Sequence, residues 1–256
     1  MRWFEPRPAP PDLRDVLACR YVARSAGHHD LLPDGAMDLV WTEGGGVVLC
    51  GPDSHAWSFD MVPGRAMAGV RFRPGAAGAV FGVPAAELVD RQVPLADLLG
   101  AATERRLVDR LETTARPDAI EHLVRRHLRA VDPIADLAAR VADDPRCGAT
   151  MLADVSGLST RQLRRRFDDA VGYGPAFYAR VARLQRFATL ALRWPERGLA
   201  ELAASAGYSD QSHLGRDTRD IAGRTPTELT ATLVGSSVDV RSVPDRSVVA
   251  TRRWAA

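Results

Sequence analysis

The spacing of apolar residues changes along the chain, from short β-forming runs in the first third to helical spacing in the remainder. Residues 38–42, 47–50 and 66–72 are such runs, and Glu43-Gly44-Gly45-Gly46 between the first two predicts a hairpin turn. Proline and glycine bound the third run. We therefore expect several short strands between about residues 20 and 73, arranged as a small antiparallel barrel or sandwich.

Beyond residue 75 the apolar positions follow a helical period. This period is found in residues 84–91, 94–99, 103–115 and 117–130. Leu107 and Leu111, for example, fall on one apolar face. We expect these helices to close the core of an amino-terminal domain, and an apolar face left over would suit dimerisation.

One pattern of residues occurs twice in the carboxyl-terminal half. Leu152-Ala153-x3-Gly157-x-Ser159-x3-Leu163-x-Arg165-x6-Gly172-x2-Pro175 recurs as Leu202-Ala203-x3-Gly207-x-Ser209-x4-Leu214-x-Arg216-x6-Gly223-x2-Pro226. In each copy the first glycine suits the left-handed position that ends a short helix, and the serine two residues later suits the N-cap of the next helix. Gln162 completes a capping-box pattern with Ser159. Each copy therefore predicts a helix-turn-helix unit.

The second helix of each unit is expected to bury one stripe and expose another. Leu163 and Phe167 share the buried stripe of the first unit, and Leu214 points inward in the second. The side chains expected to project outward are Arg161, Arg164 and Arg165 in the first unit and Gln211, Ser212, His213, Arg216 and Arg219 in the second. Arg reads guanine and Gln reads adenine through paired hydrogen bonds. Since all 34 basic residues of the chain are Arg, a solvated helix face is the alternative interpretation of Arg164-Arg165-Arg166 taken alone.

A long helix is predicted between the two units. Residues 177–192 contain neither Gly nor Pro and place apolar side chains at helical intervals, and Trp194-Pro195 follows them. At about 1.5 Å per residue this helix would be roughly 24 Å long, of the order needed to separate two units by one turn of DNA, about 34 Å. Arg180, Arg183 and Arg186 flank it, either as solvated or ion-paired arginines or as phosphate contacts.

Charge is distributed unevenly. Residues 1–145 carry 17 Arg and 21 acidic residues, a net charge of −4, whereas residues 146–228 carry 13 Arg and 9 acidic residues, a net charge of +4. A basic module beside an acidic one favours phosphate neutralisation by the first and a different task for the second.

Residues from about 131 to 234 resemble the DNA-binding domain of AraC/XylS-type transcriptional regulators. The motifs that carry the resemblance are Leu152-Ala153-Asp154-Val155-Ser156-Gly157-Leu158-Ser159, Arg161-Gln162-Leu163-Arg164-Arg165-Arg166-Phe167, Gly172-Tyr173-Gly174-Pro175-x-x-Tyr178, Arg183-Leu184, Ala206-Gly207-Tyr208-Ser209-Asp210-Gln211-Ser212-His213-Leu214 and Gly223-x-x-Pro226. The resemblance implies seven helices, in which a long central helix holds two helix-turn-helix units so that both recognition helices enter successive major grooves.

The resemblance also assigns base-reading positions. These are Arg161, Arg164 and Arg165 in the first unit and Gln211, Ser212, Gly215 and Arg216 in the second. The second unit departs from the family, because Leu214 and Thr218 stand where two phenylalanines are usual. Gly215 and Asp217 are expected among its exposed positions, where glycine weakens a helix and aspartate repels phosphate. The second helix is therefore expected to read DNA weakly, to contribute mainly backbone contacts, or to dock imperfectly until a partner is present.

The sequence predicts an α+β protein of three parts. Residues 1–130 form an amino-terminal regulatory domain, residues 131–234 form an all-α DNA-binding domain, and residues 235–256 form a loosely ordered tail. Segments 31–41 and 69–77 resemble an uncharacterised sensor-like domain of such regulators. Arg71 and Arg73 share a strand face by their spacing and would hold an anion beside Trp41 as an apolar wall. The alternatives are that the two arginines lie on an exposed strand or that they form salt bridges to Asp34 and Asp38.

Catalysis, metal binding and cofactor binding find little support. His28, His29 and His55 lack the short spacing of a metal site, and Cys19, Cys50 and Cys147 are far apart and odd in number. Gly44-Gly45-Gly46 lacks the lysine and the helix of a phosphate loop. No span approaches transmembrane length and no export signal is evident, so we expect a reduced, cytoplasmic protein that is not an enzyme and has no cofactor.

The functional hypothesis is a sequence-specific transcriptional regulator that binds double-stranded promoter DNA. A small-molecule effector or homodimerisation would act through the amino-terminal domain, and RNA polymerase would be a partner if the protein is an activator. The alternative is an adaptor whose acidic amino-terminal half docks another regulator, with no effector.

Overall fold

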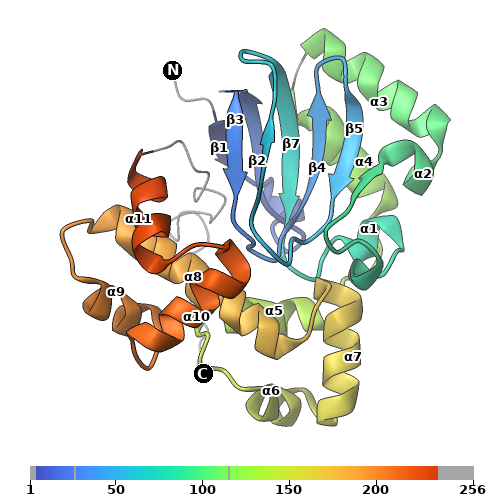
Figure 1. Ribbon diagram of the computed structural model, residues 1–256. Helices are drawn as coiled ribbons and strands as arrows, with labels where there is room; N and C mark the ends of the chain where they lie inside the picture. Colours follow the sequence, from blue (N-terminus) through green and yellow to red (C-terminus); the bar gives the residue numbers. More distant parts are fainter. Residues whose placement is uncertain (1–3, 26, 115, 236–256) are drawn as a thin grey trace.

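A computed structural model describes residues 4–25, 27–114 and 116–235, and the α+β class is confirmed. A β-sheet region with four helices occupies one end of the molecule, and helices α5 to α11 occupy the other (Figure 1). The predicted tail falls almost wholly on residues 236–256, which lie outside the described residues.

The larger sheet has six strands, and every pair of neighbours in it is antiparallel. Their order is β1(Phe4–Pro8), β2(Leu17–Arg24), β7(Ala66–Phe72), β4(Met37–Thr42), β5(Gly46–Cys50) and β8(Gln92–Pro94). β3(His28–Leu31) and β6(Trp57–Asp60) form a second, two-stranded sheet. The hairpin expected between residues 38 and 50 is confirmed, with Thr42 paired to Gly46 across the turn. Within the described residues the larger sheet is open, with β1 and β8 at its edges.

Alternation along the strands separates the two faces of the larger sheet. Leu39 and Trp41 of β4 are buried with Val70 and Phe72 of β7 in the main core of this region. Tyr21 of β2 and its neighbours Cys19 and Ala23 form a small cluster separate from that core. Helices cover the main core: α1(Gly78–Phe81), α2(Leu95–Leu99), α3(Ala101–Thr114) and α4(Asp118–His127), together with the 3-10 turn η1(Pro11–Leu13).

The prediction of a helix over residues 84–91 is wrong. Only the 3-10 turn η2(Ala85–Glu87) forms there, because Asp90 adopts a left-handed φ of 56° and β8 begins two residues later. An extended strand so close downstream leaves no room for a full helix.

Seven helices make up the carboxyl-terminal part of the described chain. They are α5(Ile134–Asp143), α6(Ala149–Ser156), α7(Thr160–Val171), α8(Pro175–Arg193), α9(Leu199–Ala206), α10(Gln211–Ala222) and α11(Pro226–Gly235). The long helix is confirmed as α8, whose 19 residues span about 28 Å at about 1.5 Å per residue. It contacts α5, α7, α9, α10 and α11, so it is the central element of this core (Figure 1).

Two hydrophobic cores divide the chain, and one amino-terminal segment crosses between them. Val124 is the last fully buried residue of the first core and Ile134 is the first helical residue of the second. The domain boundary at residue 130 stays a prediction. Leu32, although far from α5–α11 in sequence, is buried in the second core.

The segment around Leu32 is held by hydrogen bonds to the central helix. Gln185 Nε2 donates to the carbonyl oxygens of Leu32, at 3.1 Å, and Pro33, at 2.7 Å. Gly35 lies so close to the Tyr178 ring that an added Cβ would be 2.5 Å from Tyr178 Cε2. The two halves of the chain are therefore joined by chain insertion as well as by surface contact.

Candidate nucleic-acid interface

The first helix-turn-helix unit has the geometry that its sequence predicts. Gly157 ends α6 with φ 66°, and Ser159 caps α7. The capping box is complete, because Ser159 Oγ accepts from Gln162 N at 3.3 Å and Gln162 Oε1 accepts from Ser159 N at 3.0 Å. Two backbone donors that a helix start leaves unpaired are thereby satisfied.

α7 buries one stripe and presents arginines from the other. Leu163, Phe167 and Val171 are fully buried against the helical core. The side chains of Arg161, Arg164 and Arg165 are all exposed. Arg164 has only a loose contact with Asp168, at 3.9 Å, and an exposed pair of this kind contributes little to stability. All three guanidiniums therefore remain available to a partner.

The third arginine of the Arg164-Arg165-Arg166 run has a different role. Arg166 Nη2 donates to Asp132 Oδ1 at 2.7 Å, in the segment that leads into α5. Asp132 Oδ1 also accepts from Ile134 N. Arg166 therefore ties α7 to the junction between the two halves of the chain.

In the second unit, the second helix begins one residue later than the sequence predicts. Gly207 ends α9 with φ 99°, but the N-cap of α10 is Asp210 rather than Ser209. Asp210 Oδ1 accepts from His213 N at 2.7 Å, and this hydrogen bond lowers the pKa of Asp210. Ser209 Oγ instead bonds to Asp210 Oδ2 at 3.1 Å. Aspartate and serine are equally good N-caps, so the two adjacent residues could not be distinguished from sequence.

Two residues expected on the outer face of α10 are buried. Gly215 lies beneath Arg219, whose Nη1 donates to Gly215 O at 3.2 Å. Asp217 is only 3% exposed. Leu214 and Thr218 are fully buried, so both fill core positions of α10. The side chains of Gln211, Ser212 and Arg216 are exposed, as expected.

Asp217 is buried because arginines of the central helix neutralise it. Arg180 Nε lies 2.7 Å from Asp217 Oδ1, and Arg183 Nη2 lies 3.6 Å from Oδ2. Arg180 also pairs with the exposed Asp220 at 2.7 Å. These contacts support the ion-paired interpretation of Arg180 and Arg183. The carboxylate of Asp217 is therefore paired within the protein and not presented on the exposed face of α10.

The anion pocket considered for Trp41, Arg71 and Arg73 is not assembled. Trp41 is buried in the main core, while Arg71 pairs across the strands with Asp38, whose side chain alternates to the other face. Arg71 lies 2.7 Å from Asp38 and 2.9 Å from Asp34, so the salt-bridge alternative is confirmed for Arg71 alone. Arg73 lies beyond the end of β7 and donates to Arg14 O at 2.6 Å.

One loop of the amino-terminal region touches both recognition helices, a feature that the sequence did not reveal. We call residues 51–56, between β5 and β6, the bridging loop. At the end of α7, a Cβ added to Gly172 would lie 2.6 Å from Pro52 Cγ. At the end of α10, Ala56 N donates to Ile221 O at 2.7 Å. The bridging loop therefore holds the carboxyl-terminal ends of both helices and leaves their amino-terminal ends to face outward.

Asp53 is an unusual acid within the bridging loop. Burial raises its pKa to about 7, and the neighbouring carboxylates Asp34 and Asp90 act in the same direction. The loop therefore carries an acidic group that is largely protonated in weak acid and ionised above neutrality.

Neither a metal site nor a membrane span is seen in the described part of the chain. No cluster of three or more His, Cys, Asp or Glu side chains there is arranged to hold a metal ion. No helix there is both long and apolar enough to cross a membrane.

Comparison with known proteins identifies two regions. Residues 152–232 match a helix-turn-helix domain, and residues 5–94 match a domain of unknown function (DUF6597). No curated protein matches the chain. A structure of ToxT from Vibrio cholerae aligns with a TM-score of 0.44 and 8% identity, covering 82% of this chain and 97% of that one. A second ToxT structure, of strain SCE256 with an unsaturated fatty acid bound, has the same TM-score with 9% identity, covering 86% and 98%.

Asp217→Asn should destabilise the protein by on the order of 2 kcal/mol, less than a fully buried pair would lose because Arg180 reaches solvent. Asp220→Asn removes a carboxylate from the same Arg180 at an exposed site and should cost less than about 1 kcal/mol. Urea denaturation monitored by circular dichroism measures both. Equal losses in the two variants would show that burial of Asp217 does not matter.

Asp53 should make stability depend on pH. Its folded-state pKa of about 7 exceeds the ordinary 3.8, so the folded protein binds the extra proton between these values and its unfolding free energy falls as pH rises through them. Asp53→Asn lacks this dependence. The melting temperature of the variant relative to the wild type should therefore rise between about pH 5 and about pH 8. Asp15→Asn, at an exposed aspartate, is the control, and a parallel trend in both variants would contradict the assignment.

Proposed function

We propose that this chain is a DNA-binding transcription regulator of the AraC type, since residues 152–232 match a helix-turn-helix domain, and that the following side chains read the DNA. Arg161, Arg164 and Arg165 of α7 contact bases in one major groove. Gln211, Ser212 and Arg216 of α10 contact bases in the next. Gly215 is left out of this set because its backbone lies beneath Arg219.

The observation that carries the proposal is the exposure of these side chains on two capped helices. Each recognition helix follows a glycine-ended helix and has its buried stripe in the same core. α8 lies between the α6–α7 pair and the α9–α10 pair (Figure 1). Its length of about 28 Å is of the order of one DNA turn, about 34 Å, which supports the engagement of adjacent grooves.

The two recognition helices contribute unequally. Three exposed arginines on α7 supply phosphate attraction and guanine readout, whereas α10 offers one proposed arginine contact together with Gln211, which suits adenine. We propose that α7 supplies most of the affinity. α10 then adds specificity at a second site, and tethering through α8 makes its weaker contacts effective.

We further propose that the amino-terminal domain modulates DNA binding, through a small ligand or through dimerisation. The bridging loop supports this, since Pro52 touches the end of α7 and Ala56 bonds to the end of α10. A change in that loop would alter the relation between the two recognition helices. Promoter DNA as the partner implies a cytoplasmic protein, with RNA polymerase as a second partner if it activates transcription.

Arg164→Ala should weaken binding to the cognate site by about 1 to 3 kcal/mol and relax base preference at one position. Arg166→Ala is the matched control. It removes the same charge from the same helix, but from a side chain that is paired with Asp132. It should leave base preference intact. Selection of bound sequences from a random DNA pool, followed by electrophoretic titration, measures both properties. An unaltered preference in Arg164→Ala would refute its role.

Gly172→Ala tests the modulation. Gly172 has φ 100° and Gly207 has φ 99°, so both alanine variants suffer the same backbone strain. Only at Gly172 does the added Cβ collide with Pro52, whereas at Gly207 the nearest atom is at 3.8 Å. Displacing the bridging loop should loosen the two-unit arrangement and lower affinity for the full DNA site about tenfold more than Gly207→Ala does. Equal affinities of the two variants would rule out control through this contact.

A further inference from the structure

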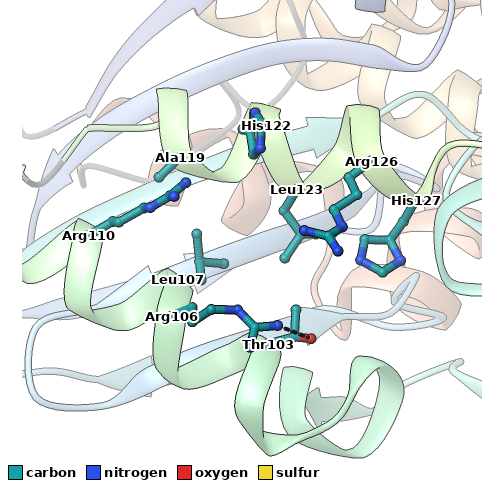
Figure 2. A pocket seen from close by; sticks show the side chains of 9 residues that line it. All are labelled: Thr103, Arg106, Leu107, Arg110, Ala119, His122, Leu123, Arg126 and His127. Atoms are coloured by element: carbon teal, nitrogen blue, oxygen red, sulfur yellow. Dashed lines mark hydrogen bonds between the residues drawn. The ribbon is translucent and has the colours of Figure 1, made fainter.

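A cationic groove lies between α3 and α4, on the far side of the sheet region from helices α9 to α11 (Figure 1). Its volume is about 180 Å³. Leu107 and Leu123 are buried at its floor. Figure 2 shows Arg106 of α3 below Arg126 and His127 of α4 at one end of this floor, and Arg110 of α3 extending toward Ala119 of α4 at the other end.

The groove concentrates positive charge without acidic neighbours in its wall. Three arginines and two histidines line it, and no Asp or Glu does. Arg106 makes one hydrogen bond, to Thr103 Oγ1 at 3.3 Å. Across the ranges that the structure describes, neither Arg106 nor Arg126 forms a salt bridge. Arg106 and Arg110 are four residues apart on one helix, a spacing at which like charges repel.

Arginines just outside the groove form salt bridges, unlike Arg106 and Arg126 within it. Arg125, next to Arg126, pairs with Asp12 at 2.6 Å. Arg20 pairs with Glu121 of α4 at 2.7 Å. Glu121 of α4 thus serves contacts with arginines that do not line the groove. Although residues 1–145 carry a net charge of −4, Arg106 and Arg126 have no carboxylate partner within the part of the chain that the structure describes.

We propose that this groove binds a compact organic anion with at least two negative charges, such as a phosphate ester or a polycarboxylate. Guanidiniums bind such groups through paired, charge-assisted hydrogen bonds. The volume of about 180 Å³ is below the roughly 300–1,000 Å³ of sites for drug-sized ligands. It therefore fits a charged head group with a short carbon skeleton, which Leu107 and Leu123 contact from below. The site is separate from the proposed DNA-reading surface.

Isothermal titration of the full chain tests the site, with pyrophosphate and citrate as probes. The wild type should bind at least one probe saturably, with one equivalent per chain. The double variant Arg106→Gln with Arg126→Gln should bind it about tenfold or more weakly. Arg105→Gln, an exposed arginine of α3 outside the groove, should match the wild type. Because the substituted side chains are exposed, melting curves are expected to confirm that all variants fold.

Two results would overturn the proposal. One is the absence of saturable binding of either probe to the wild type. The other is equal binding by the wild type and the double variant, with loss in Arg161→Gln with Arg164→Gln instead, which would assign the anion to α7. Electrophoretic titration with promoter DNA, in the absence of pyrophosphate and citrate, measures DNA binding separately. Failure of the anion-binding proposal can therefore be distinguished from failure of the DNA-binding proposal.

Discussion

The contact between the bridging loop and the carboxyl-terminal ends of α7 and α10 constrains the rest of the molecule. Pro52 meets Gly172 and Ala56 bonds to Ile221, so a single short loop of the amino-terminal region reaches both helices. The amino-terminal ends of the two helices, which carry the favourable pole for phosphate, are left outside this contact. The helix ends thus have separate tasks, one in docking and one in recognition.

A largely buried ion pair connects α10 of the second unit to the central helix α8. A core aspartate at position 217 would be costly alone, but Arg180 and Arg183 approach it from α8. Thr218 completes the same region, with its hydroxyl donating to Gly215 O at 3.2 Å. The unit is therefore joined to the central helix by a polar connection as well as by apolar packing.

Local patterns made much of this architecture predictable. Gly157, Ser159 and Gln162 specify a turn and a cap through neighbours in sequence, and both form. The β4–β5 hairpin and α8 were likewise evident from short-range composition and period. The burial of Asp217, by contrast, depends on a partner distant in the chain. Asp217 lies 37 residues from Arg180, and no periodicity reveals that such a pair will be buried.

The same limit applied to the amino-terminal site. Arg71 and Trp41 were considered together because both lie in β-forming runs, but the strand register that separates them by face follows only from the folded sheet. The groove between α3 and α4 was hidden for a related reason. Its arginines look like ordinary solvated charges until the packing of two helices places them around one hollow.

The insertion of Leu32 into the helical core has a consequence for the autonomy of that half. An excised piece beginning near residue 131 would lack a side chain that is 6% exposed in the intact protein, and emptying such a leucine site typically costs about 2 to 5 kcal/mol. It would also leave the Gln185 amide without its two carbonyl acceptors. The helical half is therefore not expected to be fully stable when excised, because part of its core and of its hydrogen bonding comes from the half that precedes it.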